Sequence, residues 1–202
     1  MTRFYFVRHG ETIWNREGNR YCGRTDLPLT PDGLQQAHQL AKNLGQLSFD
    51  HAVVSPRLRA RQTAQPLLTK LGLSMQIDER LREIEFGDWE GLTPQEIQQS
   101  FADLWRAWTE DPTAVHAGRW GESAQEVLAR MLAVIQDWTV RRPRRVLVVS
   151  HNTAIRILIA GALGMPLSQY RAIEIDNGGV LVVDVDENGT WTWKLGMCLA
   201  AG

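Results

Sequence analysis

Three groups of arginine and histidine residues each stand shortly after a short apolar run. Arg8 and His9 follow residues 4–7, Arg57 and Arg59 follow residues 52–54, and His151 follows residues 146–149. An imidazole nitrogen can attack phosphorus, and a guanidinium can bind two phosphate oxygens at once. Two like charges about 4 Å apart repel by roughly 4 kcal/mol at an effective dielectric constant of about 20, so such a cluster needs an anion at its centre. The pattern therefore predicts a site for a phosphate group.

The apolar runs before these groups are typical of buried β-strands, because they are short and rich in β-branched and aromatic residues. In open α/β sheets, ligands bind at the carboxyl ends of the strands. We therefore expect the three groups to meet at one edge of a parallel sheet. The sequence contains no phosphate-binding G-x-x-x-x-G-K-[ST] loop and no H-E-x-x-H zinc helix. The chemistry is accordingly expected to depend on side chains, with no metal and no cofactor.

Helical patterns alternate with the strands. Apolar residues recur at helical spacing over residues 34–44, 60–71, 123–141 and 153–163. N-cap residues or prolines that favour a helix start precede several of these segments, and a further helix start stands at Thr93. At the C-terminal end, residues 178–184 and 190–193 flank Asn188-Gly189, which predicts a β-hairpin. Alternation of strand and helix predicts a three-layer α/β/α sandwich with a mostly parallel central sheet. We expect one domain over residues 1–202.

Composition excludes several classes of protein. The 202 residues carry 22 basic and 23 acidic side chains, for a net charge of −1, which is not the charge of a dedicated nucleic-acid binder. Two cysteines, Cys22 and Cys198, are too few for a disulfide framework and fit a reducing compartment. No apolar run approaches the roughly 18 residues that span a bilayer, and the N-terminus lacks a signal-peptide pattern. We expect a cytoplasmic protein with no nucleic-acid or membrane partner.

The strand-end residues belong to longer motifs that occur in a fixed order. They are Arg8-His9-Gly10-Glu11-Thr12 with Trp14-Asn15, Leu29-Thr30-Pro31-Asp32-Gly33, Ser55-Pro56 with Arg59-Ala60 and Thr63-Ala64, Leu81-Arg82-Glu83-Ile84 with Phe86-Gly87-Asp88-Trp89-Glu90-Gly91, Gly121-Glu122-Ser123, and Ser150-His151-Asn152. Together these motifs resemble the histidine phosphatase superfamily, which includes the cofactor-dependent phosphoglycerate mutases. The resemblance extends along most of the chain and implies a phosphoglycerate mutase-like fold.

The resemblance implies a role for each of five residues. His9 is expected to be the nucleophile that forms a phosphohistidine, while Arg8, Arg59 and His151 hold the three phosphoryl oxygens. Glu83 is expected to protonate the leaving alcohol and then to accept a proton from water. Glu85, two residues further on, is the competing candidate for that role.

Four further residues are expected to complete the substrate contacts: the side chains of Asn15 and Asn152 and the backbone around Cys22 and Gly23. By analogy with the family, residues 94–121 form a short insertion over the active site, and we call this segment the lid. Residues 101–120 are the least regular part of the sequence, and their three tryptophans are expected to act mainly as packing anchors, with some lining a substrate pocket. These are Trp105, Trp108 and Trp120.

These features favour a metal-independent phosphatase that acts on a small phosphorylated metabolite. A short lid that admits water favours hydrolysis, whereas a mutase must retain the phosphoryl group and donate it again. A phosphoglycerate mutase is the first alternative, and a non-catalytic sensor of phosphorylated ligands is the second. The C-terminal hairpin, with Trp191 and Trp193, is either a homodimer edge or the last layer of the core.

Overall fold

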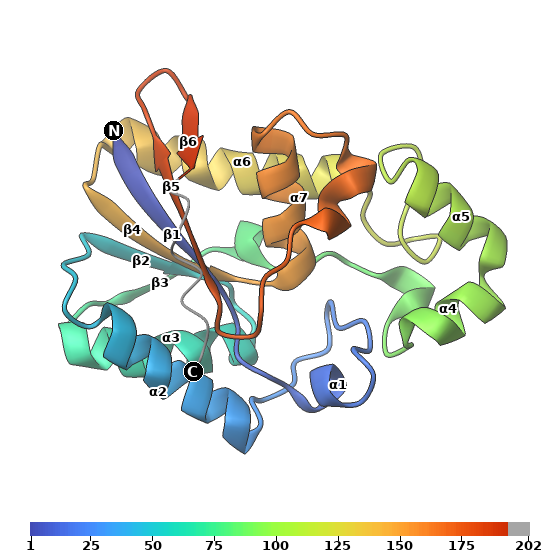
Figure 1. Cartoon of the computed structure of the whole chain (residues 1–202), viewed down its shortest axis with the longest axis horizontal. Coiled ribbons are helices and arrows are strands. Elements are labelled where there is room, and N and C mark those ends of the chain that lie inside the picture. The colour runs from blue at the N-terminus through green and yellow to red at the C-terminus, as the bar shows by residue number, and fades with distance from the viewer. Residues whose placement is uncertain (194–202) are drawn as a thin grey trace.

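A mixed sheet of six strands organises the part of the chain that the computed structural model describes, residues 1–193 (Figure 1). The strand order is β3-β2-β4-β1-β5-β6. The first four strands in chain order run parallel, and β5 and β6 are antiparallel to their neighbours. The strands are β1 (Thr2–Arg8), β2 (His51–Val54), β3 (Met75–Ile77), β4 (Arg145–Ser150), β5 (Val180–Val185) and β6 (Trp191–Trp193).

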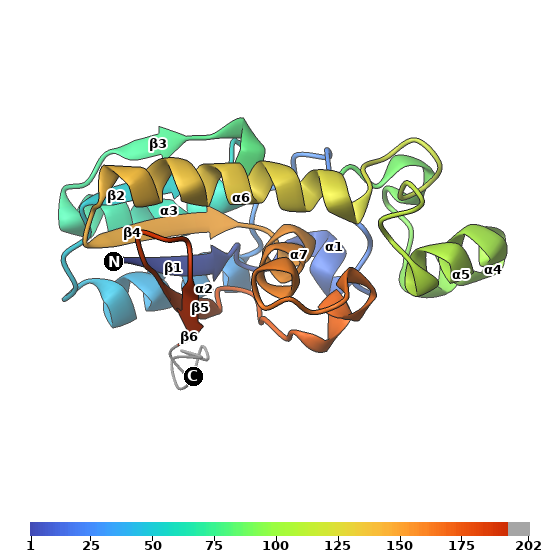
Figure 2. The same cartoon turned by 90° about the horizontal axis from the view of Figure 1, so that it is seen from above.

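Helices cover both faces of this sheet. The seven α-helices of the described residues are α1 (Ile13–Arg16), α2 (Pro31–Leu44), α3 (Leu58–Leu71), α4 (Pro94–Ser100), α5 (Ala102–Glu110), α6 (Ala124–Arg141) and α7 (Asn152–Ala162). Alternate residues of β1 enter opposite cores: Phe4 and Phe6 pack with α6 and α7, whereas Tyr5 and Val7 pack with α2 and α3. Figure 2 shows α6 running along one face of the sheet and α2 on the other. The predicted three-layer α/β/α sandwich is confirmed.

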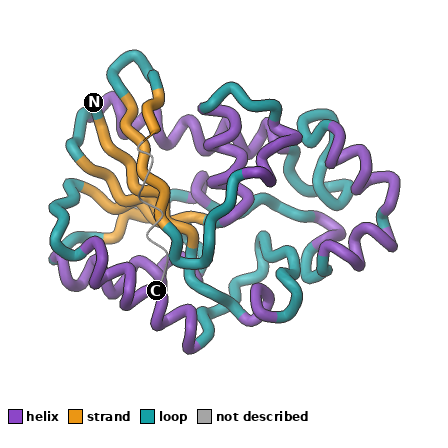
Figure 3. Tube along the Cα trace, viewed as in Figure 1, coloured by secondary structure: helices purple, strands orange, loops and turns teal. Residues whose placement is uncertain are grey.

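The lid stands beyond the carboxyl ends of β1 and β4, apart from the sheet (Figure 1 and Figure 3). Its central part was expected to be irregular, and that expectation is wrong because residues 102–110 form α5. The helix lacks a side-chain cap at Phe101, so its start carries no sequence signal. Burial of Trp108, which is 1% exposed, holds the helix against the core.

Trp120 differs from its expected role as a packing anchor, because its side chain is 51% exposed. Its indole Nε1 donates a hydrogen bond to Asp88 at 2.7 Å, and the guanidinium of Arg24 lies 4.9 Å from its ring. The residue before it, Arg119, has a positive φ of 71°, so the chain turns sharply here. Trp120 therefore connects the end of the lid to Asp88 and Arg24 outside it.

The C-terminal hairpin forms as expected. β5 pairs with β1 on one side and with β6 on the other, and Trp191 stacks on Phe6 with ring centroids 6.2 Å apart. Trp191 thus packs against the core, while the homodimer remains an expectation. Cys198 lies outside the described residues. Within those residues, no helix is long and apolar enough to cross a membrane.

Candidate active site

His9 and His151 lie side by side although 141 positions separate them in the chain. β1 and β4 pair in parallel register, with Arg8 opposite Ser150, and the backbone N–H of His9 donates to the Ser150 carbonyl at 3.1 Å. The two strands therefore end together, which brings the imidazole centroids of His9 and His151 to 5.1 Å. Both side chains are buried. The expected convergence of distant segments at the carboxyl edge of the sheet is present.

The imidazole of His9 has a defined tautomer. Its Nδ1 lies 2.7 Å from the carbonyl oxygen of Gly10, which can only accept a hydrogen bond, so Nδ1 carries the proton. Burial lowers the pKa of His9 well below its usual value of 6.5, and the charges of Arg59 and Arg8 lower it further. The ring is therefore neutral, and Nε2 holds an unshared electron pair.

The loop after His9 depends on a close contact between two glycines. A Cβ added at Gly10 would lie 2.6 Å from the carbonyl oxygen of Gly33, and one added at Gly33 would lie 2.2 Å from the carbonyl oxygen of Glu11. Gly33 belongs to the first turn of α2, which Thr30 caps through a hydrogen bond from the Gly33 N–H at 3.0 Å. The start of α2 therefore supports the loop that holds the nucleophile candidate.

Both ring nitrogens of His151 already have hydrogen-bond partners. Arg59 donates from Nε to Nδ1 at 3.2 Å, so Nδ1 is an acceptor and Nε2 donates to the hydroxyl of Ser55 at 2.7 Å. Burial lowers the pKa of His151 well below its usual value, and Arg59 and His9 add to the effect. His151 is therefore a neutral imidazole held from two sides.

Arg59 is completely buried and ties the segment 22–25 to the site. Its Nη1 donates to the Thr25 carbonyl at 2.8 Å, and its Nη2 donates to the carbonyls of Cys22 and Gly23 at 2.9 and 3.1 Å. With the bond to His151, four of its five N–H groups are engaged. One N–H of Nη1 is left for a phosphoryl oxygen, so the predicted clamp by Arg59 stays a prediction resting on that donor.

Arg8 lines the pocket in front of His9. Its Nη1 donates to the carbonyl of Ile175 at 2.7 Å, whereas its buried Nε has no partner among the described residues. Burial lowers the pKa of Arg8 to about 10, and the charge of Arg156 contributes. The guanidinium stays charged at neutral pH and has a free donor.

Glu83, and not Glu85, is the carboxyl group at the pocket. Its Oε1 accepts hydrogen bonds from the N–H groups of Ile84 and Ala154 at 3.0 and 2.9 Å, and its Oε2 accepts one from Thr153 at 3.0 Å. Glu83 is buried and lines the pocket, whereas Glu85 is 28% exposed and lies 3.6 Å from Arg57. Position therefore favours Glu83 over Glu85, and its role as the acid stays a prediction.

The environment of Glu83 favours its protonated form. Burial raises the pKa of this carboxyl, and the N–H donors of Thr153, Ile84 and Ala154 oppose the rise without cancelling it. Because Oε2 accepts only one of these bonds, it has room for a proton. The Ser150 hydroxyl donates to the carbonyl of Leu81 at 2.7 Å and so fixes the segment that carries Glu83 to the end of β4.

The pocket in front of His9 has a volume of about 440 Å³. Six of the nine predicted site residues line it: Arg8, His9, Asn15, Cys22, Glu83 and Asn152. Arg59 and His151 do not line it, although the ring of His151 lies next to that of His9 and is bonded to Arg59. Phe86, which stands in one of the motifs, and Trp105, one of the lid tryptophans, also line it. Other lining residues carried no motif in the sequence, and they include Tyr21, Arg156, Tyr170 and Arg171. Of these, only Arg156 had a usable signal, because it stands one helical turn after Asn152 on the same face of α7.

The predicted backbone contact of Gly23 is not supported. The N–H of Gly23 donates to both carboxylate oxygens of Glu90, at 3.1 and 3.0 Å, so it has no hydrogen left for phosphate. Asn15 lines the pocket, and its Oδ1 accepts from Thr12 and Asn177, so a contact of its Nδ2 with phosphate stays a prediction. Burial raises the pKa of the Cys22 thiol to about 11, so this group is a neutral wall of the pocket.

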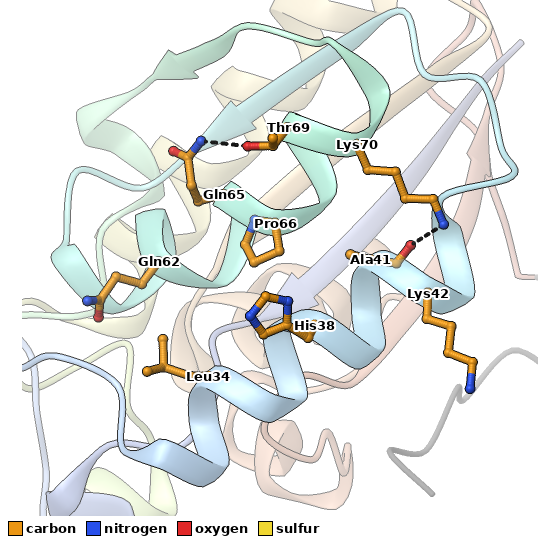
Figure 4. Close-up of a pocket in the computed structure, with 9 residues that line it drawn as sticks. All are labelled: Leu34, His38, Ala41, Lys42, Gln62, Gln65, Pro66, Thr69 and Lys70. Carbon is orange, nitrogen blue, oxygen red and sulfur yellow. Dashed lines mark hydrogen bonds between the residues drawn. The ribbon is translucent and has the colours of Figure 1, made fainter.

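A second cavity, of about 680 Å³, lies between α2 and α3 (Figure 4). It is lined by His38, Pro66 and long polar side chains, with Lys70 donating to the Ala41 carbonyl at 3.4 Å, and it contains none of the predicted site residues. It lacks the buried histidine, arginine and glutamate groups of the smaller pocket. Within residues 1–193, no three His, Cys, Asp or Glu side chains are grouped to hold a metal ion; independence from metals stays a prediction.

Comparison with known proteins gives consistent results. The sequence matches the histidine phosphatase superfamily (branch 1) over residues 4–196. A protein of Enterobacter sp. (strain 638) named "Probable phosphoglycerate mutase GpmB" is 34% identical over 195 residues, which cover 93% of this chain and 87% of that protein. The structure of a mycobacterial glucosyl-3-phosphoglycerate phosphatase with VO3 has a TM-score of 0.87 at 30% identity, covering 97% of this chain and 99% of that one. The alpha-ribazole phosphatase from Shigella flexneri has a TM-score of 0.83 at 31% identity, covering 100% of this chain and 98% of that one.

Proposed function

Because the chain belongs to the histidine phosphatase superfamily, we propose that it hydrolyses phosphate monoesters of small molecules through a phosphohistidine on His9. The phosphatases among its structural neighbours support assignment as a phosphoric monoester hydrolase. A pocket of about 440 Å³ suits a small phosphorylated metabolite. Activity without a metal or a cofactor, a cytoplasmic location and the absence of nucleic-acid and membrane partners belong to the same proposal.

The observation that carries this proposal is the state of His9. A neutral imidazole whose Nδ1–H is held by the Gly10 carbonyl presents its basic Nε2 to the pocket. Attack of a side-chain nucleophile splits one difficult displacement into two easier ones. A histidine serving only to bind phosphate would gain from a proton, whereas burial and two arginines keep this one unprotonated.

In the first step, Nε2 of His9 bonds to phosphorus while the ester P–O bond breaks. Arg8 and the free N–H of Arg59 stabilise the charge that spreads over the phosphoryl oxygens. For His151 to add a further donor, its Nε2–H would have to leave the hydroxyl of Ser55. The proton on Glu83 passes to the leaving oxygen, which departs as a neutral alcohol. Burial of Glu83 supplies the raised pKa that this transfer needs.

In the second step, water attacks the phosphohistidine. The Glu83 carboxylate accepts a proton from the water, a P–O bond forms as the P–N bond breaks, and inorganic phosphate leaves. His9 returns to the neutral tautomer, and Glu83 regains its proton. The sequence of steps needs no redox partner and no external group other than water.

A phosphoglycerate mutase is the second candidate, favoured by the relative of that name. Primed with 2,3-bisphosphoglycerate and given 3-phosphoglycerate, a mutase produces 2-phosphoglycerate faster than free phosphate. We expect phosphate to be released faster. The reverse order of rates assigns the mutase reaction.

A sensor that only binds phosphorylated ligands has no need for Glu83. The carboxyl is buried at an energetic cost beside the pocket, and burial raises its pKa, which is the direction that proton donation needs. This arrangement favours turnover over binding alone.

Phosphate release from a panel of monoesters, with p-nitrophenyl phosphate as reference, tests the proposal. We expect His9→Ala to abolish release and ³²P from labelled substrate to be trapped on His9 after an alkaline quench. His38→Ala, in the other cavity, is the matched histidine control and should retain wild-type rates. Turnover that survives in His9→Ala, or label on another residue, rejects the mechanism.

A further inference from the structure

Two arginines of the active-site pocket form no ion pair with an acidic side chain of residues 1–193. Arg156 lies on α7, and Arg171 lies in the 3-10 helix Leu167–Ala172. Neither forms an ion pair or a side-chain hydrogen bond within the described residues, and both have a buried nitrogen with no partner, Nε of Arg156 and Nη2 of Arg171. Arg20 lines the same pocket but is already bonded to Glu96 at 3.0 Å and to the Gly91 carbonyl at 2.9 Å. The pocket therefore contains free cations beyond those needed at His9.

Unpaired buried polar atoms are concentrated at this pocket. Six such side-chain atoms occur among the described residues, and four belong to pocket residues: Arg8 Nε, Asn152 Oδ1, Arg156 Nε and Arg171 Nη2. Buried polar groups are normally paired, because leaving a donor without an acceptor is costly. Three of the four atoms are guanidinium donors, so the missing partner is an acceptor, and the positive charge favours an anion.

The three guanidinium groups also act on one another. Burial is the largest cause that lowers the pKa of Arg8 to about 10, and the charge of Arg156 lowers it further. Burial likewise lowers the pKa of Arg156, and the charge of Arg171 lowers it further, against the opposing effects of Tyr170, Glu83 and Glu174. Among residues 1–193, Glu83 is the one acidic residue that lines the pocket, and the proposed reaction needs it protonated. A phosphoryl group next to His9 neutralises the charge at Arg8 and leaves the charge at Arg156 and Arg171.

Arg171 is held in a defined orientation. Its guanidinium carbon lies 4.9 Å from the ring centroid of Trp105 and 4.7 Å from that of Tyr170. The hydroxyl of Tyr170 accepts a hydrogen bond from the indole of Trp108 at 3.3 Å, so the lid fixes this stack. Aromatic rings contact the face of a guanidinium and leave the N–H groups at its edge to bind the oxygens of a carboxylate or a phosphate.

We propose that Arg156 and Arg171 form a second anion-binding subsite, so that the substrate is a phosphate monoester bearing a further carboxylate or phosphate group. The subsite deepens the proposed function and rests on it. The pocket volume of about 440 Å³ leaves room for a ligand larger than the phosphoryl group. The transferred group binds at His9 and Arg8, and the second anion binds between α7 and the 3-10 helix.

Two matched pairs of substrates test the subsite. 3-Phosphoglycerate and glycerol 3-phosphate differ by a carboxylate against a hydroxymethyl group, and propane-1,3-diol bisphosphate and its monophosphate differ by one phosphate. We expect kcat/KM to favour the anionic member of at least one pair by about tenfold to a hundredfold, the range for hydrogen bonds to a charged group. The pair that shows the larger preference indicates whether the subsite binds a carboxylate or a phosphate.

Variants assign the preference to the two arginines. We expect Arg156→Gln and Arg171→Gln each to reduce the preference at least fivefold. Arg20→Gln, which removes a paired arginine of the same pocket, should keep it. Equal kcat/KM within both pairs for the wild type, or a preference that survives both substitutions, overturns the subsite while leaving the phosphatase intact.

A binding measurement separates this proposal from the proposed function. In His9→Ala, calorimetry should give a lower Kd for the anionic member of the preferred pair than for its neutral partner, and the difference should shrink in His9→Ala/Arg156→Gln. If the wild type hydrolyses no monoester but this difference is found, the phosphatase assignment fails and the subsite stands. If hydrolysis occurs and the difference is absent, the subsite fails alone.

Discussion

Replacing Glu83 with Gln removes the proposed acid while keeping the size of the side chain. The carboxyl accepts three backbone hydrogen bonds, on both of its oxygens. An amide has one oxygen, so its NH2 must face either the Thr153 N–H or the two N–H groups on the other side. The orientation in which the NH2 faces only the Thr153 N–H costs less. Loss of that one hydrogen bond lowers the free energy of unfolding by about 1–3 kcal/mol. Loss of acid and base catalysis lowers kcat by about 10²–10⁴-fold.

The two chemical steps respond differently when the leaving group is changed. An alkyl phosphate needs a proton on the departing oxygen, so Glu83→Gln should slow the first step. The leaving group of p-nitrophenyl phosphate departs without a proton, so the rate of the first step should be close to that of the wild type. The second step needs a base, so its rate should fall. Stopped-flow measurement of Glu83→Gln should then show a burst of about one equivalent of nitrophenol, followed by slow turnover, with phosphohistidine accumulating.

Glu85→Gln is the matched control, because Glu85 is two residues away and faces Arg57. We expect its kcat to stay within about twofold of the wild type, as for most surface substitutions. If Glu83→Gln turns over alkyl phosphates at the wild-type rate, or if Glu85→Gln causes the larger loss, Glu83 is not the acid. If burst and steady state of Glu83→Gln fall together, its role as base in the second step is refuted.

Three further predictions concern the rest of the site. EDTA should leave kcat unchanged, since the mechanism uses only side chains; recovery on adding Mg²⁺ or Zn²⁺ contradicts it. The lowered pKa values of His9 and His151 mean that the folded state excludes their protons, so stability is full above pH 6.5 and falls as the pH drops through the lowered values. The slope is at most about 1.4 kcal/mol per pH unit for each imidazole, and denaturant titrations of His9→Asn should show a shallower dependence. Arg59→Lys should lower the free energy of unfolding by about 3 kcal/mol or more, because one ammonium cannot replace bonds to three carbonyls and His151; an unchanged melting temperature argues against that anchoring role.

The convergence of His9 and His151 was predictable because each follows an apolar strand, and parallel strands end at one edge. Their tautomers were not, because these depend on Gly10, Arg59 and Ser55, which only the folded chain brings near. The choice between Glu83 and Glu85 likewise depends on which carboxyl faces the start of α7. No local pattern marks that difference.

The errors have local causes. No sequence signal marks the start of α5, because Phe101 provides no cap and tertiary packing of Trp108 stabilises the helix instead. The residue type of Trp120 predicts packing, but this residue follows the turn at Arg119 and is half exposed. Arg156 was within reach from its spacing on α7, whereas Arg171 gains its place only from the stack with Trp105 and Tyr170.

Helix α7 joins several parts of the site in one rigid body. It begins directly after His151, donates two N–H groups to Glu83, and carries Asn152 and Arg156 into the pocket. A core substitution that tilts this helix would displace Glu83, His151 and the substrate-contacting side chains together. New substrate preferences are therefore more accessible through changes in α5 and the 3-10 helix, whose side chains touch the pocket without holding the reacting groups. Substitutions in these two segments can change substrate specificity while the reacting groups keep their positions.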